Sequence, residues 1–189
     1  MKPIIKNKIQ NLTTYKTPKN FRGRSAILVQ FWWMVYTVFF RLSPQFLYAW
    51  RRFLLRLFGA KIGKNVIIRP TARITYPWKV SIGDYSWIGD DVVLYSLGNI
   101  KIGENTVISQ RSYICTGTHD YNSEDFRIYA EDINIGSRCW LATDVYIAPG
   151  ITIEDGVVVG ARSSVFSDLD ANKVYVGSPA KSIKNRKLE

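Results

Sequence analysis

The sequence predicts an all-β fold, a parallel β-helix of six-residue repeats preceded by an α-helical N-terminal segment. An aliphatic residue recurs at every sixth position over much of the chain, and many of these residues are followed by glycine. A small or β-branched residue stands four positions after many of them. A helix would show a period near 3.6 and an ordinary strand a period of 2, so neither explains the pattern. A β-helix does, because each repeat is one short strand plus one corner of a coil.

The aliphatic positions can be followed in the printed sequence. They are Ile62, Ile68, Ile74, Ile82, Ile88, Leu94, Ile102, Ile108 and Ile114, then Ile135, Leu141, Ile147, Ile153, Val159 and Val165. Three repeats make one triangular coil, and several coils must stack, because one coil cannot bury its own interior. The spacing widens to eight residues from Ile74 to Ile82 and from Leu94 to Ile102, which predicts a two-residue bulge at each of these corners.

Residues 21–59 are predicted to form a helical cap in front of the coils. Residues 26–40 are almost wholly apolar, but a run of this length is too short for a transmembrane helix, which needs about 20 residues. A second helix is predicted to begin with Ser43 as N-cap and Pro44 at its first position. Gly59 is predicted to end that helix.

The second helix is expected to be amphipathic. It carries Phe46, Leu47, Trp50, Phe53, Leu54, Leu57 and Phe58 beside Arg51, Arg52 and Arg56. Aromatic residues next to arginine are typical of helices that lie in a membrane interface. The alternative is that both helices cover the open edge of the first coil and a neighbouring subunit, since a bare sheet edge invites aggregation. The two roles are compatible, so peripheral membrane contact through residues 21–58 remains open beside capping.

Charge is distributed very unevenly along the chain. The net charge is +11, yet no Asp or Glu precedes Asp84, and that stretch holds 16 Lys and Arg. The remainder has 10 basic and 15 acidic residues, so the two parts carry +16 and −5. Such asymmetry indicates an anionic partner, either a membrane or nucleic acid. Nucleic acid is disfavoured, because the basic residues share their faces with large aliphatic side chains.

The first part of the chain shows no secretory signal, so we expect a cytoplasmic protein. Residues 1–20 are polar and basic, and we expect a flexible N-terminus there. The two cysteines do not suggest a disulfide framework.

The chain resembles the hexapeptide-repeat acyltransferases, and within them the sugar O-acetyltransferases and the colanic acid biosynthesis acetyltransferases. The segments that carry the resemblance are FLLRLFGAKIG (53–63), SIGDYSWIGD (81–90), CTGTHDY (115–121), CWLATDVYIAPGITIEDG (139–156), VVVGARSSVFSDL (157–169) and VYVGSPAKSI (174–183). The resemblance implies a left-handed β-helix over residues 60–170, against the usual right-handed crossover. It also implies an extruded loop at 115–132 and a tail at 171–189 near coenzyme A.

His119 is the only histidine, and it lies where the six-residue register breaks between Ile114 and Ile135. Long loops in compact folds are commonly functional, although a lone loop histidine is more often a surface residue. The resemblance implies that His119 is the general base of direct acetyl transfer to a sugar hydroxyl. An imidazole suits that role, because it can accept the hydroxyl proton as attack begins.

The acceptor sugar and the oxyanion need further residues. Tyr121, in the same loop, and Asp90 and Asp91, at an earlier corner, are candidates for holding the acceptor; a solvated corner is the alternative for both aspartates. Asp120 is a candidate for orienting the base. The resemblance places the backbone donors for the oxyanion in residues 140–143.

The resemblance also implies acetyl-CoA as donor, no metal, and a homotrimer with the donor between subunits. The expected donor-binding residues are Trp140, Ala142, Thr143, Gly160, Ala161, Arg162, Pro179, Ala180, Lys181 and Lys184. For Lys181 and Lys184, which would approach the phosphates, a generic basic tail is the alternative.

The predicted function is O-acetylation of a sugar, in exopolysaccharide or other surface glycan biosynthesis. A basic aromatic N-terminal segment would suit an acceptor on a lipid carrier at the inner membrane face. Two alternatives remain, a non-catalytic scaffold at the membrane surface and a transferase that uses an acyl carrier protein. A zinc enzyme of this fold is set aside, because its metal would take three histidines and the chain has one.

Overall fold

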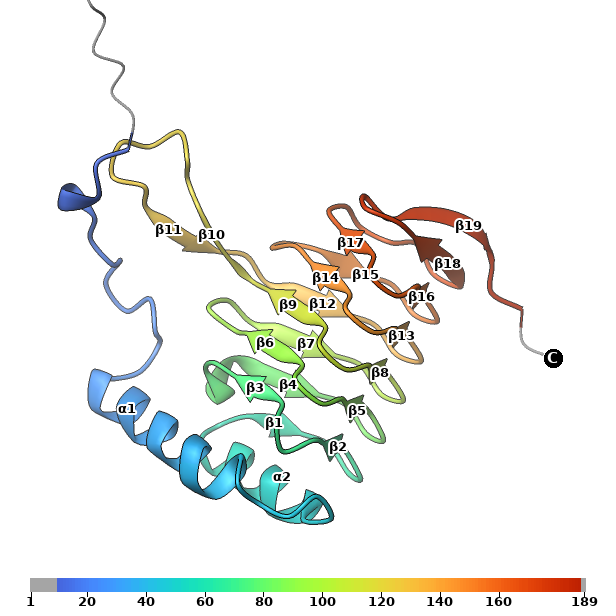
Figure 1. The fold of residues 1–189 in the computed structure, drawn as a ribbon, viewed down its shortest axis with the longest axis horizontal. Helices are drawn as coiled ribbons and strands as arrows, with labels where there is room; N and C mark the ends of the chain where they lie inside the picture. The colour runs from blue at the N-terminus through green and yellow to red at the C-terminus, as the bar shows by residue number, and fades with distance from the viewer. Residues whose placement is uncertain (1–9, 188–189) are drawn as a thin grey trace, which may run out of the picture.

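The protein is described by a computed structural model over residues 10–187, and it is a triangular parallel β-solenoid with two helices beneath its first coil (Figure 1). Each complete coil gives one short strand to each of three sheets. Sheet A contains β1 (Lys61–Ile62), β4 (Val80–Ile82), β7 (Ile100–Ile102), β12 (Ile133–Ile135) and β15 (Thr152–Ile153). Sheet B contains β2 (Ile67–Ile68), β5 (Trp87–Ile88), β8 (Val107–Ile108), β13 (Trp140–Leu141), β16 (Val158–Val159), β18 (Lys173–Val176) and β19 (Lys181–Asn185). Sheet C contains β3 (Arg73–Ile74), β6 (Val93–Tyr95), β9 (Tyr113–Cys115), β14 (Tyr146–Ile147) and β17 (Ser164–Val165).

The six-residue register forms the core. Every aliphatic residue of the predicted period is at most 7% exposed, and equivalent residues pair from coil to coil, as Ile62 does with Ile82. The small residues four positions later are also buried, among them Ser86, Thr106 and Ser112. Their hydroxyls donate to backbone carbonyls of the next coil, so the polar atoms inside the prism are satisfied. The predicted fold class, a left-handed parallel β-helix, is confirmed.

Both predicted bulges lie at the edge where sheet C meets sheet A. The first contains η3 (Pro77–Lys79), a single turn of 3-10 helix. Lys79 reaches across to the second bulge, where its ammonium donates to the carbonyl of Leu97. The same ammonium donates to the carbonyl of Phe21 at 2.9 Å, and this contact holds the segment before the helices against the prism.

The first helix follows the apolar run found in the sequence. Ser25 caps α1 (Ala26–Val35), which continues as a π-helical turn, η2 (Tyr36–Phe40). Val29, Trp32 and Phe40 are buried against the rest of the protein. The run therefore forms a helix that packs through one side only.

The second helix, α2 (Tyr48–Leu57), begins later than predicted. The proposed N-cap at Ser43 is wrong, because its hydroxyl donates to the carbonyl of Phe40 at 2.6 Å and accepts from Arg51 at 2.8 Å. The predicted end is correct. Gly59 has a φ of +90°, and its amide and that of Ala60 close the last turn onto the carbonyls of Arg56 and Leu55.

The arginines of α2 face the solenoid and satisfy its open end. The second coil accepts hydrogen bonds from the first on the carbonyls of Ile82, Ser86, Ile88, Val92 and Leu94. The five equivalent carbonyls of the first coil have no coil beneath them, and four are met by side chains. The donors are Trp32 to Ile74 (3.0 Å), Arg51 to Ile68 (2.7 Å), Arg52 to Val66 (2.8 Å) and Arg56 to Ile62 (2.7 Å). Capping of the first coil is thus largely polar, an arrangement that the sequence analysis did not predict.

A β-hairpin leaves the prism after β9, also at the edge between sheets C and A. It pairs β10 (Gly117–His119) with β11 (Ile128–Ala130), and Figure 1 shows it projecting well beyond the coils. Part of the predicted flexible N-terminus lies against it: a short 3-10 turn, η1 (Leu12–Thr14), is followed by Tyr15 beside the hairpin, and Asn11 donates to Glu124 at 2.7 Å. Residues 1–9 of that predicted segment lie outside the described residues.

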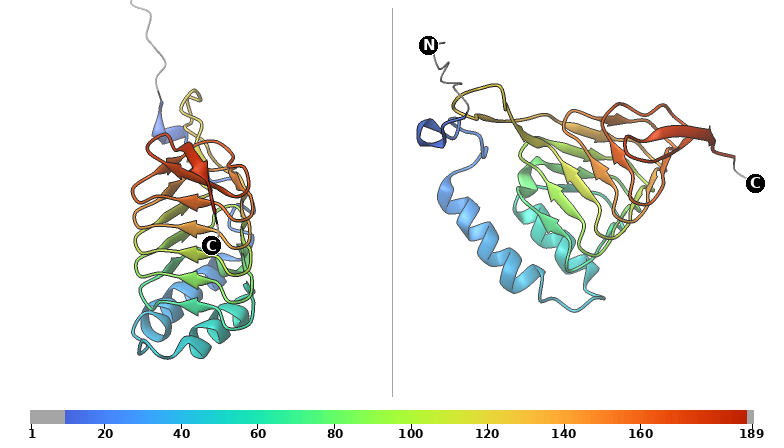
Figure 2. Two further views of the ribbon diagram at one scale, coloured as in Figure 1. Left: turned by 90° about the vertical axis from the view of Figure 1, so that its right-hand side faces the viewer. Right: turned by 45° about the horizontal axis from the view of Figure 1, so that its top comes forward.

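The C-terminal tail closes the other end of sheet B. β18 adds in parallel to β16, and β19 turns back to pair with β18 in antiparallel fashion (Figure 2). Within residues 10–187, the helices are all too short or too polar to traverse a bilayer.

Candidate functional site

His119 is held in one orientation by the hairpin. Its Nδ1 lies 2.8 Å from the carbonyl oxygen of Phe126, and its ring stacks on the Phe126 ring with centroids 4.3 Å apart. A carbonyl only accepts hydrogen bonds, so Nδ1 carries the proton and Nε2 keeps its lone pair. The half-buried imidazole is therefore in the tautomer that a general base requires.

The prediction that Asp120 orients His119 is wrong. Asp120 follows directly after the last residue of β10. Its carboxylate lies 3.3 Å from Arg127 and accepts from the amide of Asn122. The backbone of Phe126 holds His119 instead.

Two tyrosines belong to the surroundings of the candidate base, one in the hairpin and one in the N-terminal segment. Tyr121 is 80% exposed in the hairpin. Tyr15, which the sequence analysis did not single out, has its ring centroid 6.3 Å from that of His119. Its position follows from the N-terminal segment packing on the hairpin, and nothing in the local sequence signals it.

The other predicted residues gather along the edge between sheets B and C, which we call the B–C edge. Backbone bonds stack its corners: Arg111 donates to Asp90 (2.9 Å), Asp144 to Gln110 (3.1 Å) and Arg162 to Thr143 (2.9 Å). The corners along it are Asp90 and Asp91, Gln110 and Arg111, Ala142 and Thr143, and Gly160, Ala161 and Arg162. The structure thus brings Asp90 and Asp91 together with five of the ten donor candidates on one line.

Ion pairs run along the B–C edge. Asp90 lies 2.8 Å from Arg69, and Asp144 lies 2.8 Å from Arg111 and 3.7 Å from Arg162. The hydrogen bond from Arg111 lowers the pKa of Asp144. Asp91 is exposed and has a φ of +55°. Asp90 is already paired, so Asp91 is the carboxylate of the two that a ligand could engage without displacing a protein partner.

His119 does not reach this line in a single protomer. The hairpin leaves at the edge between sheets C and A, whereas Asp90 and Thr143 lie at the B–C edge. The strands of sheet C run between the two edges (Figure 1). His119 and the residues of the B–C edge therefore lie at opposite edges of sheet C.

The outer face of sheet C carries an aromatic ladder that the sequence analysis missed. Tyr113 lies between Tyr95 and Tyr146, with ring centroids 5.9 and 6.3 Å apart. Burial raises the pKa of all three phenols, that of Tyr146 to about 12, with Cys115 contributing. The sequence contains a signal for this ladder, since Tyr113 and Tyr146 each precede an aliphatic position on the same sheet.

Trp140 stands half-exposed on the outside of sheet B, beside the B–C edge. Its indole donates to the hydroxyl of Ser109 at 3.0 Å. The amides of Trp140 and Ala142 donate to the next coil, at 2.9 Å each, so they are not available to an oxyanion. Of the segment 140–143, Thr143 is the residue whose amide lies outside both the strand and these bonds between coils.

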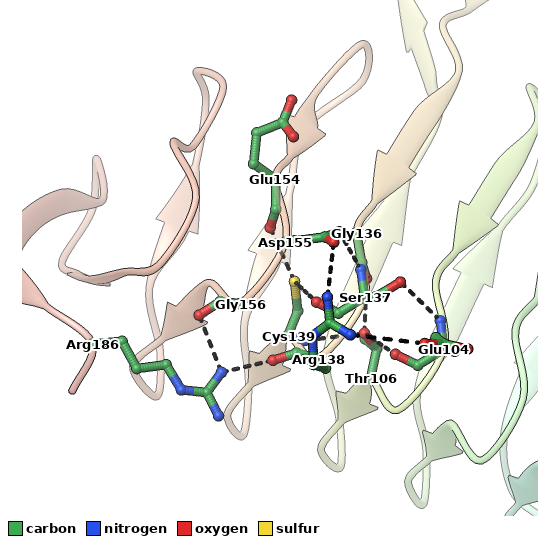
Figure 3. Close-up of polar contacts among 10 residues, drawn as sticks. All are labelled: Glu104, Thr106, Gly136, Ser137, Arg138, Cys139, Glu154, Asp155, Gly156 and Arg186. Atoms are coloured by element: carbon green, nitrogen blue, oxygen red, sulfur yellow. Dashed lines mark hydrogen bonds and ion pairs between the residues drawn. The ribbon is translucent and has the colours of Figure 1, made fainter. Parts of the chain in front are cut away.

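A hollow of about 380 Å³ borders Trp140 and contains Arg138 and Arg186. Figure 3 shows how both arginines are engaged: Arg138 faces Glu104 and Asp155, and Arg186 donates to the carbonyls of Arg138 and Gly156. These contacts fix the tail after β19 to the coils. Both arginines that line the hollow are therefore engaged by the protein itself.

The remaining donor candidates lie in the tail. Ala180 donates to Ser164 at 2.8 Å, which places the turn that contains Pro179 over the last coil. Lys181 and Lys184 are exposed on β19. No three His, Cys, Asp or Glu side chains gather as a metal site in the part of the chain that the structure describes.

Comparison with known proteins identifies the family. No protein-family model matches the chain. The fold matches a maltose O-acetyltransferase from Clostridium difficile 630, with a TM-score of 0.79 and 27% identity over 87% of this chain and 90% of that one. It also matches a hexapeptide-repeat acetyltransferase from Vibrio cholerae, solved with acetyl-CoA, with a TM-score of 0.79 and 24% identity over 87% and 92%. The WcaF protein of Escherichia coli K12, named as a colanic acid biosynthesis acetyltransferase, is 62% identical over 94% of this chain and 98% of its own length.

The chain belongs to the hexapeptide-repeat acetyltransferases. The expected family and enzyme class are thereby confirmed. Another relative, the galactoside O-acetyltransferase of Escherichia coli K12, is 28% identical over 71% of this chain and 68% of its own length.

Proposed function

We propose that the protein transfers an acetyl group from acetyl-CoA to a sugar hydroxyl during synthesis of a surface glycan. The observation that carries this proposal is the bond from His119 Nδ1 to the Phe126 carbonyl, which leaves Nε2 as a proton acceptor. The names of the relatives support the substrate class, since they act on galactosides or maltose or belong to colanic acid biosynthesis. Because acetyl-CoA is a cytoplasmic metabolite, the proposed reaction would take place in the cytoplasm.

The proposed reaction is a single transfer without a covalent enzyme intermediate. Nε2 of His119 accepts the proton of the sugar hydroxyl while its oxygen attacks the acetyl carbonyl. The amide of Thr143 stabilises the oxyanion that forms. The carbon–sulfur bond then breaks, and the thiolate of coenzyme A takes the proton back from His119.

The proposed enzyme is a homotrimer in which two protomers build each site. Because His119 and the B–C edge flank sheet C from opposite sides, the hairpin of one protomer would meet the B–C edge of its neighbour. The acetyl-CoA arm would lie against Thr143, Ala161 and Arg162, and its phosphates near Lys181 and Lys184. Three equivalent interfaces would give three sites.

The proposal is tested by titrating the protein with acetyl-CoA in a calorimeter, beside His119→Asn. We expect similar donor affinity for both proteins, and thiol release with acceptor sugars from the wild type alone. Wild-type protein that is folded but does not bind acetyl-CoA would overturn the donor assignment and favour a carrier-protein donor or a scaffold. Thiol release at the wild-type rate by His119→Asn would remove His119 from the mechanism.

A further inference from the structure

Two stripes of apolar side chains face away from the protein on α1–η2 and α2. On the first helix they are Ile27, Phe31, Met34 and Val38; on the second they are Trp50, Phe53 and Leu57, with Phe46 in the turn just before it. Both stripes follow the same spacing of four, three and four residues. Within a helix this spacing keeps side chains on one face, and Phe46 extends the second stripe from the turn before α2. Their exposed fractions run from 38% for Trp50 to 83% for Ile27. We call the two stripes together the apolar end face.

The opposite sides of these helices are already occupied. Trp32 and Phe40 of the first helix are fully buried, and so is Arg51 of the second, which donates to the first coil. The helices cannot turn to bury their stripes without losing the hydrogen bonds that close the solenoid. The apolar end face is therefore a fixed surface.

The two stripes join into one patch. The indole of Trp50 donates to the carbonyl of Phe39 at 2.9 Å, and Phe31 packs on Phe58 with ring centroids 5.6 Å apart. A hollow of about 330 Å³ between the helices is lined mainly by apolar side chains, including Phe31 and Leu57. A continuous apolar patch that spans two helices marks an interaction site rather than scattered surface residues.

Charge argues for an anionic bilayer as the partner. The exposed charged side chains of residues 21–64 are all basic, and no acidic residue precedes Asp84. Besides Arg56, which donates to Ile62, they are Arg22, Arg24, Arg41, Lys61 and Lys64. Cationic residues beside Trp and Phe on helices that lie flat are the pattern of interfacial membrane binding. A second copy would present the same positive charge to this face. In Figure 2 the helices cover the end of the coil stack, whereas prisms that pack side by side would use their flanks.

We propose that the apolar end face lies on an anionic lipid surface, with the coils standing away from the membrane. Phe46 and Leu57 enter the boundary between headgroups and acyl chains, and the surrounding arginines and lysines contact lipid phosphates. The proposal for the apolar end face rests on the geometry of the helices and does not depend on the acetyl transfer proposed above.

The test is sedimentation of the full chain with vesicles of phosphatidylglycerol and phosphatidylethanolamine, and with vesicles of phosphatidylcholine alone. We expect binding to the anionic vesicles only. The double variant Phe46→Gln/Leu57→Gln should bind at least about tenfold more weakly. Phe166→Gln is the matched control, since Phe166 is equally an exposed aromatic residue but lies after β17, near the other end of the stack. It should bind as the wild type does.

Three results would overturn the proposal. They are no binding to anionic vesicles, equal binding to both vesicle types, and unchanged binding by the double variant. Circular dichroism and light scattering of each variant complete the test. A double variant that folds normally but loses its oligomeric state would show that the apolar end face is an interface between copies instead.

Discussion

Nδ1 of His119 lies 2.8 Å from the backbone carbonyl oxygen of Phe126, seven residues further along the same hairpin. The residue that orients the candidate base is therefore a main-chain group, and no carboxylate shares its proton. Phe126 has a φ of +46°, uncommon for a bulky residue, and this conformation accompanies the turn of its carbonyl toward the imidazole.

Asp120→Asn should leave catalysis nearly intact. The carboxylate pairs with Arg127, and an exposed pair of this kind contributes about 0–1 kcal/mol to stability. We expect kcat to fall by less than about threefold, whereas loss of an aspartate that holds a catalytic histidine costs roughly 10⁴-fold. The measurement is the steady-state kcat of Asp120→Asn beside that of His119→Asn. A loss of kcat in Asp120→Asn comparable to that in His119→Asn would mean that Asp120 acts on the base.

Two inactive variants should complement each other if each site spans two protomers. His119→Ala removes the base, and Ala161→Trp blocks the exposed corner of the B–C edge. When equal amounts of the two variants assemble at random, about a quarter of all sites would combine an intact hairpin with an intact edge. Co-expressed variants should then recover roughly that share of wild-type activity, while separately purified and unmixed proteins stay inactive. No recovery in mixed trimers would place the whole site in one protomer.

Arg51→Met should destabilise the fold. Arg51 is fully buried, and its guanidinium donates to Ile68, Ser43 and Pro44. Buried acceptors left without donors cost about 1–3 kcal/mol each, so we expect a loss on the order of 3 kcal/mol in urea denaturation. Lys101→Met, on the exposed side of β7, is the control and should stay within about 0.5 kcal/mol of wild type. Equal midpoints for the two variants would show that Arg51 does not close the first coil.

Stability should fall at alkaline pH because of the aromatic ladder. Burial raises the pKa of Tyr146 to about 12 from the ordinary 10.0, so the folded protein holds this phenol proton more tightly than the unfolded chain. The contribution of Tyr146 is fully present below pH 10 and disappears as the pH rises toward about 12. Urea denaturation across this range should show a shallower decline for Tyr146→Phe. An identical decline in both proteins would mean that Tyr146 titrates normally when folded.

The fold could be predicted because one rule is repeated many times. Each aliphatic residue from Ile62 to Val165 points into the prism, so a single misassigned position could not shift the register. The corners were less predictable. Tyr85, Arg138 and Arg162 take left-handed conformations with φ of 57–59°, where glycine or asparagine would be expected, because the stacked coils impose the turn.

The site was only partly predictable. Asp90, Thr143 and Arg162 stand at equivalent corners of their repeats, so their alignment follows from the period. The partner of His119 could not be found in this way, since a backbone carbonyl has no side-chain signature. The orientation of α2 could not be predicted either. Arg51 donates to a carbonyl at the open end of the first coil, and the position of that carbonyl depends on how the coils fold.

Each coil of the solenoid acts as a template for the next, and nothing in the repeat itself specifies where stacking should begin. Four side chains donate to the first coil in place of a preceding coil, and so they give the protein a defined length. They belong to Trp32, Arg51, Arg52 and Arg56. Without these four donors, the first coil would present a row of acceptors to the last coil of another molecule. Such a head-to-tail contact does not close on itself, and an enzyme of fixed size would become the subunit of a fibre.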